Sequence, residues 1–145
     1  MEYRKNDIVT LEIVDCGTDG EGIGKADGFT VFVKDAVIGD TVTAKIMKAK
    51  KNYGYGRLME ILNASPYRVE PVCPSARQCG GCQLQAVSYE EQKAFKEKKL
   101  RGHLERIGGF KELPMEPLIG MDEPYHYRNK AQFPVGRNKE GRIVT

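Results

Sequence analysis

The chain has 145 residues and a mass of 16.2 kDa, with 40% apolar residues, 30% charged residues and a formal net charge of +3. This length allows one domain or two small ones. A domain of fewer than about 70 residues is only marginally stable unless a cross-link such as a metal site stabilises it. No stretch approaches the roughly 20 apolar residues of a membrane span, and residues 1–13 lack the apolar run of a secretory signal. We therefore expect a cytoplasmic protein with no membrane partner.

The charge is divided unevenly along the chain. Residues 1–40 hold nine acidic and four basic side chains, whereas residues 41–59 hold no acid and five bases. Like charges grouped on one surface influence binding more than the net charge does. The composition therefore points to residues 41–59 as a candidate surface for an anionic partner.

The first 63 residues favour short strands separated by glycines. Alternating or β-branched apolar residues predict strands at 7–15, 29–33, 41–48 and 56–62. We assign the glycines between them to turns, where they admit positive φ: Gly17, Gly20, Gly22, Gly24, Gly28 and Gly39. Short strands with closely spaced turns predict a small β-barrel, closed or partly open.

The acid-free segment joins cations to phenolic rings. Its members are Lys45, Lys48, Lys50, Lys51, Tyr53, Tyr55 and Arg57. Single-stranded RNA sites use the same combination, because cations neutralise phosphates and rings stack on bases. A solvated strand edge that lysines protect from aggregation would explain the charges about as well.

A proline-rich connector leads into a cluster of three cysteines. Pro66, Pro71 and Pro74 lack the amide hydrogen that a helix or central strand needs, so residues 63–74 should be extended. Cys73, Cys79 and Cys82 follow with C-x5-C-x2-C spacing. In a reducing cytosol such a cluster favours a metal over disulfides, and thiolates bind both iron-sulfur clusters and structural zinc.

Both kinds of centre normally need four ligands. Cys16, His103, His126 or a residue beyond Thr145 could supply the fourth. Each of the three named residues also has a simple explanation as a non-ligand, which we prefer: Cys16 is a small thiol after a strand, and the histidines lie in polar surroundings.

A helix is predicted from Ser88 to Gly108. Ser88 and Glu91 have the spacing of a capping box, and an apolar face recurs with a helical period: Tyr89, Leu100, Leu104 and Ile107. Extended chain follows, and the last residues predict two strands about a turn at residues 138–141.

Residues 127–133 (YRNKAQF) alternate as a strand does. Alternation would put Arg128, Lys130 and Gln132 on one side, where they suit phosphate and base-edge contacts. A polar outer strand face is an equally good explanation.

At these residues the sequence resembles the TRAM-containing, iron-sulfur branch of the RNA uracil-5-methyltransferases that act on 23S ribosomal RNA. The resemblance is carried by the glycine-rich segment 20–40, by SPYRVEPVCP at 65–74, by CGGCQLQAVSYEEQ at 79–92 and by YRNKAQFPVG at 127–136.

The resemblance implies a mostly β fold followed by α/β structure. Residues 1–66 should form an OB-like TRAM barrel that binds RNA. Residues 67–145 should form the iron-sulfur loop, the helix and the first strands of a central domain. In the family four cysteines bind a [4Fe-4S] cluster; three match Cys73, Cys79 and Cys82, and the fourth is expected beyond Thr145.

A Rossmann-like methyltransferase domain that binds S-adenosylmethionine is expected to lie outside this chain. In the family a cysteine thiolate adds to uracil C6, and C5 takes the methyl group. A base then removes the C5 proton, and the thiolate leaves C6. The nucleophile, the base and the cofactor loop belong to that domain, so we name no catalytic or cofactor-binding residue here and expect this chain alone to be inactive.

Two hypotheses remain open at this point. The chain is a fragment of the methyltransferase, or it is a complete, non-enzymatic RNA-binding module with a zinc or iron-sulfur knuckle. The fragment hypothesis is favoured by the strand-like end at residues 143–145 and by the presence of only three cysteines in the cluster. We expect a monomer with ribosomal RNA as its partner, and no DNA.

Overall fold

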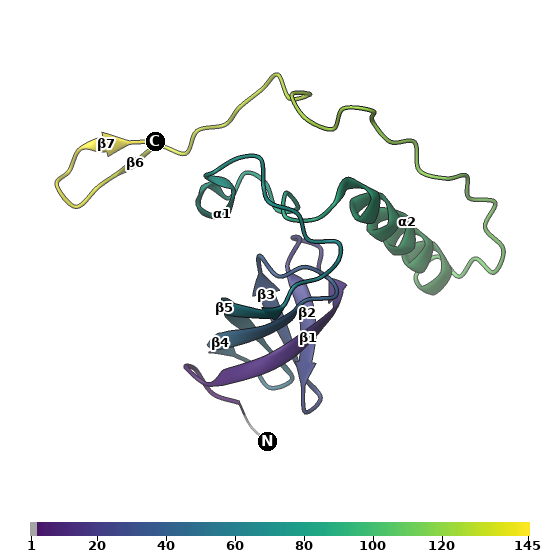
Figure 1. Ribbon diagram of the computed structural model, residues 1–145, viewed down its shortest axis with the longest axis horizontal. Helices are drawn as coiled ribbons and strands as arrows, with labels where there is room; N and C mark the ends of the chain where they lie inside the picture. The colour runs from purple at the N-terminus through teal and green to yellow at the C-terminus, as the bar shows by residue number, and fades with distance from the viewer. Residues whose placement is uncertain (1–2) are drawn as a thin grey trace.

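The computed structural model describes residues 3–145, which form a β-barrel followed by a helical and extended part (Figure 1). The closed barrel has the strand order β1-β2-β3-β5-β4. Its strands are β1 (Ile8–Cys16), β2 (Gly22–Ala26), β3 (Phe29–Lys34), β4 (Thr41–Ala49) and β5 (Tyr53–Asn63). β3 and β5 pair in parallel, and the other neighbours pair antiparallel. The expected OB-like barrel is confirmed.

The core of the barrel follows from the alternation of apolar residues along its strands. Because side chains on a strand point alternately to its two faces, every second residue can be buried. The inward positions are Val9, Leu11, Ile13, Val31, Val33, Val42, Ala44 and Ile46, each at most 5% exposed. The intervening positions of β3, β4 and β5 consequently face outward.

Strand β2 was not predicted, and its glycines were wrongly assigned to turns. A Cβ at Gly22 would lie 2.8 Å from the carbonyl oxygen of Ala36, and one at Gly24 would lie 2.8 Å from that of Glu12. Glycine within a strand marks such a close backbone approach. Gly20, Gly28 and Gly39 do have positive φ, as expected of turn glycines.

A buried ion pair fastens the connector to the barrel. Asp40 is fully buried, and its carboxylate accepts hydrogen bonds from Val37 N–H at 2.7 Å and Ser65 N–H at 2.8 Å. Arg68 donates to the same carboxylate through Nε at 3.1 Å and to the carbonyl oxygen of Asp35 at 2.9 Å. Burial alone would raise the pKa of Asp40, but the hydrogen bonds and the Arg68 charge outweigh it and lower that pKa.

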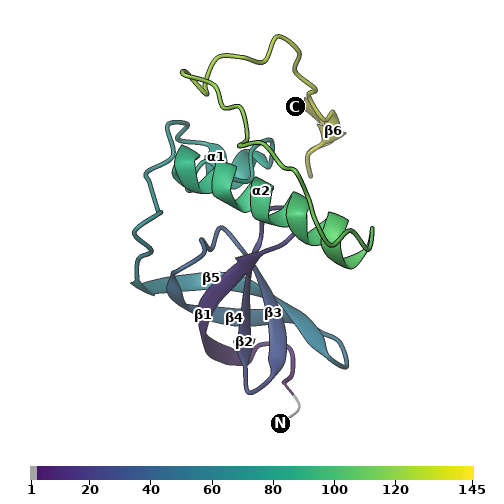
Figure 2. The same ribbon diagram turned by 90° about the vertical axis from the view of Figure 1, so that its right-hand side faces the viewer.

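Two helices lie beyond one end of the barrel, α1 (Ala76–Cys79) and α2 (Tyr89–Arg106) (Figures 1 and 2). Ser88 caps α2 as predicted, its Oγ accepting from Glu91 N–H at 3.4 Å. Phe95 of α2 lines a small cavity with barrel residues, whereas Leu100 and Ile107 of the apolar face are 52% and 81% exposed. Within residues 3–145, neither helix has the length and apolar character that a membrane crossing requires.

The C-terminal part is mostly extended chain. The predicted hairpin is present as β6 (Gly136–Arg137) and β7 (Ile143–Val144), with Asn138 Oδ1 accepting from Glu140 N–H and Arg142 N–H at 3.0 Å each. The strand expected at residues 127–133 is wrong, because all of these residues are described and none is in a strand. Within residues 3–145 no strand pairs with them, and alternation of residue types alone supplies no hydrogen-bond partner.

Candidate nucleic-acid interface and cysteine loop

The cations and tyrosines of the acid-free segment share the outer surface of β4, β5 and the turn between them. Lys45 lies opposite Arg57, and Lys48 lies opposite Tyr55 in the antiparallel register. Lys50 and Lys51 occupy the turn and are exposed. The cations and tyrosines of residues 45–57, which are close together in the sequence, therefore lie on one outer surface formed by β4 and β5.

The parallel pairing of β3 with β5 adds residues that sequence reasoning missed. Phe32 is the register partner of Tyr55, and Lys34 is the register partner of Arg57. The alternation of FTVFVK could have indicated that Phe32 and Lys34 point outward. Their position beside residues 53–57 depends on a non-local pairing that the alternation does not reveal.

Three rings form a contiguous cluster on this surface. The ring centroids of Phe32 and Tyr53 are 5.9 Å apart with the planes at 88°, and those of Phe32 and Tyr55 are 5.6 Å apart. The Tyr53 and Tyr55 centroids are 5.9 Å apart, again edge to face. Tyr53 is 38% exposed and Tyr55 45% exposed, so ring surface is available to a ligand.

We call this surface the aromatic-basic face: Phe32, Tyr53 and Tyr55 with Lys34, Lys45, Lys48, Lys50, Lys51 and Arg57. An open hollow of about 430 Å³ lies over its rings, lined in part by Thr30 and Asn52. Rings that offer π surface beside cations suit bases and phosphates of one strand.

The other predicted contacts lie elsewhere. Arg128, Lys130 and Gln132 are exposed in the extended C-terminal chain. Arg128 lines a cavity of about 330 Å³ with Cys82 and Tyr89, so it lies near the cysteine loop and not on the aromatic-basic face.

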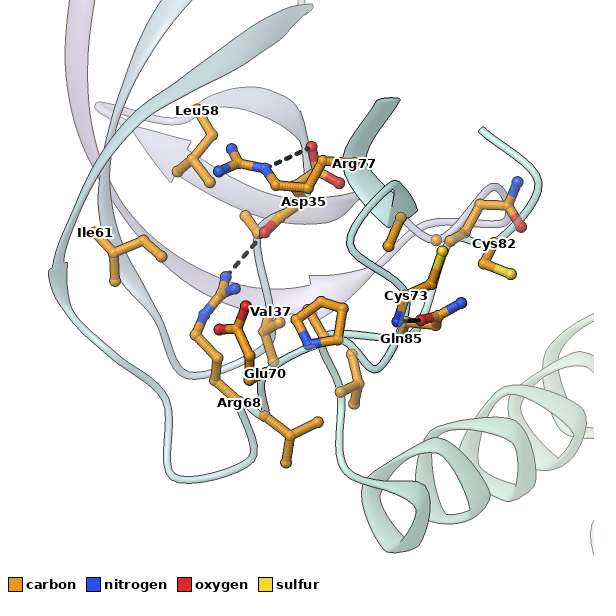
Figure 3. A pocket seen from close by; sticks show the side chains of 18 of the residues that line it. Asp35, Val37, Leu58, Ile61, Arg68, Glu70, Cys73, Arg77, Cys82 and Gln85 are labelled. Carbon is orange, nitrogen blue, oxygen red and sulfur yellow. Dashed lines mark hydrogen bonds and ion pairs between the residues drawn. The ribbon is translucent and has the colours of Figure 1, made fainter. Parts of the chain in front are cut away.

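The cysteine loop, residues 73–82, is held against the barrel (Figure 3). Cys73 and Cys82 line a cavity of about 350 Å³ together with barrel residues such as Leu58 and Ile61. Two contacts of Arg77 join the loop to the barrel side. Its Nε lies 3.7 Å from Asp35 Oδ2, and its carbonyl oxygen accepts from Lys34 Nζ at 3.4 Å.

The three cysteines offer the right donor type without a formed metal site. Cys73, Cys79 and Cys82 are exposed and free. α1 ends at Cys79, and Gly80 follows in the left-handed conformation at φ 73°, which turns the chain toward Cys82. Among residues 3–145, no group of three or more His, Cys, Asp or Glu side chains is placed to hold a metal. The donor chemistry therefore fits a thiolate-bound centre, whereas the arrangement of the side chains does not complete one.

Cys16 has a different environment from the cysteines of the loop. It is partly buried at the end of β1, and its Sγ lies 3.6 Å from the carbonyl oxygen of Gly17. Burial raises the pKa of Cys16 to about 11, and the nearby acids Glu21 and Asp15 act in the same direction, while Lys99 opposes them. A thiol of this kind stays protonated at neutral pH and is a poor ligand or nucleophile.

A small closed barrel with an aromatic and basic outer face is the architecture of a nucleic-acid-binding module. Residues 4–59 match the family model of the TRAM domain. The expected resemblance to TRAM-containing RNA methyltransferases is also confirmed over almost the whole chain.

The relatives are bacterial proteins named as RNA methyltransferases. One from Halalkalibacterium halodurans is 48% identical over 141 residues, which is 97% of this chain and 31% of the relative. One from Clostridium tetani is 47% identical over 96% of this chain and 30% of the relative. One from Clostridium acetobutylicum is 50% identical over 94% and 30%. This chain therefore spans about a third of the length of the curated relatives it matches.

A solved structure gives a weaker match. The solution structure of a conserved protein of Methanococcus maripaludis is 28% identical and covers 40% of this chain and 83% of that chain, with a TM-score of 0.38. The assignment of the barrel consequently rests on the strand order and the family match.

Proposed function

We propose that this chain is the RNA-binding part of an RNA methyltransferase. The observation that carries the proposal is the aromatic-basic face, where the rings of Phe32, Tyr53 and Tyr55 lie together beside the cations of β3, β4 and β5. The family match and the names of the relatives support RNA as the partner.

The salt dependence of RNA binding tests the proposal. Each cation that meets a phosphate of a single strand contributes roughly 0.7 to the slope of log affinity against log salt. Replacing Lys48, Lys50 and Lys51 with alanine should weaken binding to all sequences and flatten the slope by about 2. The matched control replaces three exposed lysines that do not belong to the face, Lys98, Lys111 and Lys139, and so removes the same charge. An unchanged slope in the first variant would assign these lysines to a solvated surface.

For the whole protein, we propose S-adenosylmethionine-dependent methylation at C5 of a uridine in 23S ribosomal RNA. The sequence segments that resemble the uracil-5 branch support this finer activity, and the relatives' names support methyl transfer to RNA generally. The test is transfer of labelled methyl groups to unmodified 23S RNA by the longer protein, followed by identification of the modified nucleoside. Methylation of another base or another position would contradict the assignment.

We propose a [4Fe-4S] cluster at Cys73, Cys79 and Cys82, with a fourth ligand from outside residues 1–145. The donor type and the loop spacing support it. Such a cluster would supply a rigid structural link between the loop and the rest of the protein. Anaerobically purified longer protein should contain iron and acid-labile sulfide, and its visible absorption should bleach on reduction. Stoichiometric zinc without iron would overturn the cluster.

A further inference from the structure

The three rings of the aromatic-basic face lie too close together to take a base between them. The ring centroids are 5.6 to 5.9 Å apart in all three pairs of Phe32, Tyr53 and Tyr55. A base between two rings needs them about 7 Å apart, which is twice the stacking distance of about 3.4 Å. A base can therefore meet only the outward surfaces of the cluster.

Tyr53 stands nearly at right angles to the other two rings. Its plane makes 88° with that of Phe32 and 81° with that of Tyr55. Consecutive bases of a stacked strand are nearly parallel, so such a stack cannot lie flat on both tyrosines. A base that lies flat on one tyrosine instead presents its edge to the other, and edge-to-face contacts between aromatic rings are favourable. We call this arrangement of Tyr53 and Tyr55 the ring corner.

The ring corner opens into a single hollow. Both tyrosines line the open hollow of about 430 Å³, together with Thr30, Phe32 and Asn52. One ligand in this hollow can thus touch both rings. Among the described residues, those that line it include no acid. The Thr30 hydroxyl and the Asn52 amide can each donate and accept hydrogen bonds, as the edge of a nucleobase requires.

Cations flank the ring corner on two sides. On the β4 side, Lys48 is the register partner of Tyr55. Lys50 lies across from Tyr53, since its N–H donates to the Tyr53 carbonyl oxygen at 2.7 Å. Along β5, Arg57 follows Tyr55 on the same outward side. These three cationic side chains are exposed. Each nucleotide within a strand has a phosphate on either side, and cations on two sides of the rings suit both phosphates.

We propose that the ring corner holds a single base of an RNA strand, flat on one tyrosine and edge-on to the other, with the flanking phosphates over the cations on its two sides. The base stack of the strand ends there, because a tyrosine takes the place of one neighbouring base. This inference rests on the proposed RNA-binding function and adds the unit that is bound, one nucleotide with its two phosphates.

A double-mutant cycle on the 145-residue chain tests whether both rings hold the same base. Tyr53→Leu, Tyr55→Leu and the double variant are compared by fluorescence anisotropy with a labelled uridine hexamer. Each single replacement should weaken binding roughly five- to tenfold, the lower part of the range for a stacked base. Since both rings contact one base, the double variant should bind within about threefold of the weaker single variant.

Two outcomes of this cycle would overturn the ring corner. If the two losses multiply in the double variant, the tyrosines contact separate bases. If one of the single replacements leaves the affinity unchanged, only one ring contacts RNA. Tyr67→Leu is the matched control, because Tyr67 is 43% exposed and does not belong to the aromatic-basic face. It should keep the wild-type affinity.

A mononucleotide provides a second test that needs no variant. Uridine 3′,5′-bisphosphate carries one base and both flanking phosphates, and it is titrated while the ring signals of Tyr53 and Tyr55 are followed by NMR. Both rings should shift with one dissociation constant, and the uridine hexamer should shift the same two rings. Ribose 3,5-bisphosphate lacks the base and should leave the ring signals in place. Ring signals that respond only to longer strands would overturn the inference.

These measurements separate the inference from the function on which it rests. Binding of the hexamer with independent losses at Tyr53 and Tyr55 would overturn the ring corner and leave RNA binding intact. Failure of the hexamer and the bisphosphate to bind would overturn both.

Discussion

Asp40 shows how one buried acid holds two parts of the chain together. Its carboxylate accepts backbone hydrogen bonds from Val37, which precedes β4, and from Ser65, which follows β5. It also accepts a charged hydrogen bond from Arg68. Removing one partner of a buried pair leaves the other charge uncompensated. Asp40→Asn should therefore lower the free energy of unfolding by about 3 kcal/mol. Urea unfolding followed by circular dichroism measures this, and the exposed Glu12→Gln should stay within about 0.5 kcal/mol of wild type.

The same carboxylate should make the stability depend on acid pH. Because the pKa of Asp40 is lower in the folded chain than in the unfolded one, its contribution is complete above the unfolded value of about 3.9. The contribution is lost as the pH falls from there through the folded pKa. Unfolding midpoints should thus drop more steeply below about pH 4 in wild type than in Asp40→Asn. Parallel curves for the two proteins would show that Asp40 does not titrate in this range.

At the scale of elements, local patterns predicted most of the barrel and missed its closure. Alternation located β1, β3, β4 and most of β5, because a half-buried strand must alternate. β2 was missed because Gly22 and Gly24 are typical turn residues when the partner strand is unknown.

The candidate site divides in the same way. The cations and tyrosines of residues 45–57 were predictable because they are contiguous in sequence. Phe32 and Lys34 were not, because the parallel β3–β5 pairing is what brings them beside residues 53–57. Which side chains of different strands become neighbours depends on this pairing, and the hydrophobic periodicity of a single segment does not reveal it.

Glycines in β5 should be essential to closing the barrel. A Cβ at Gly54 would lie 2.9 Å from the carbonyl oxygen of Lys48 and 3.0 Å from the Phe29 ring. Gly54→Ala must shift backbone or ring, which should cost about 1–3 kcal/mol as overpacking does. Gly136→Ala is the control, since among the described residues nothing lies within 4 Å of a Cβ there. Equal unfolding midpoints for the two variants would contradict the tight approach.

For the whole molecule, the barrel and the C-terminal chain should differ in local stability. The barrel core is buried, whereas large apolar side chains beyond α2 are exposed, for example Ile119 at 96% and Phe133 at 74%. Segments with few buried contacts open at low free-energy cost. Amide hydrogens of residues 111–135 should therefore exchange early, and those of β1, β3 and β4 last. Protection of residues 111–135 equal to that of the barrel would show packing that this structure lacks.

We expect that the 145-residue chain alone does not methylate RNA. Methyl transfer to uracil C5 needs a thiolate, a base and a bound methyl donor held in one site. Burial keeps Cys16 protonated at neutral pH, since its pKa is about 11, and the other cysteines lie exposed in the loop proposed to bind the cluster. Within residues 3–145 the strands build a barrel and a short hairpin, without the βα units and glycine-rich strand-to-helix turn of a dinucleotide-type fold. Labelled S-adenosylmethionine and unmodified 23S RNA provide the assay, with the longer protein as positive control. Incorporation by the 145-residue chain that a single cysteine replacement abolishes would place the active site within these residues.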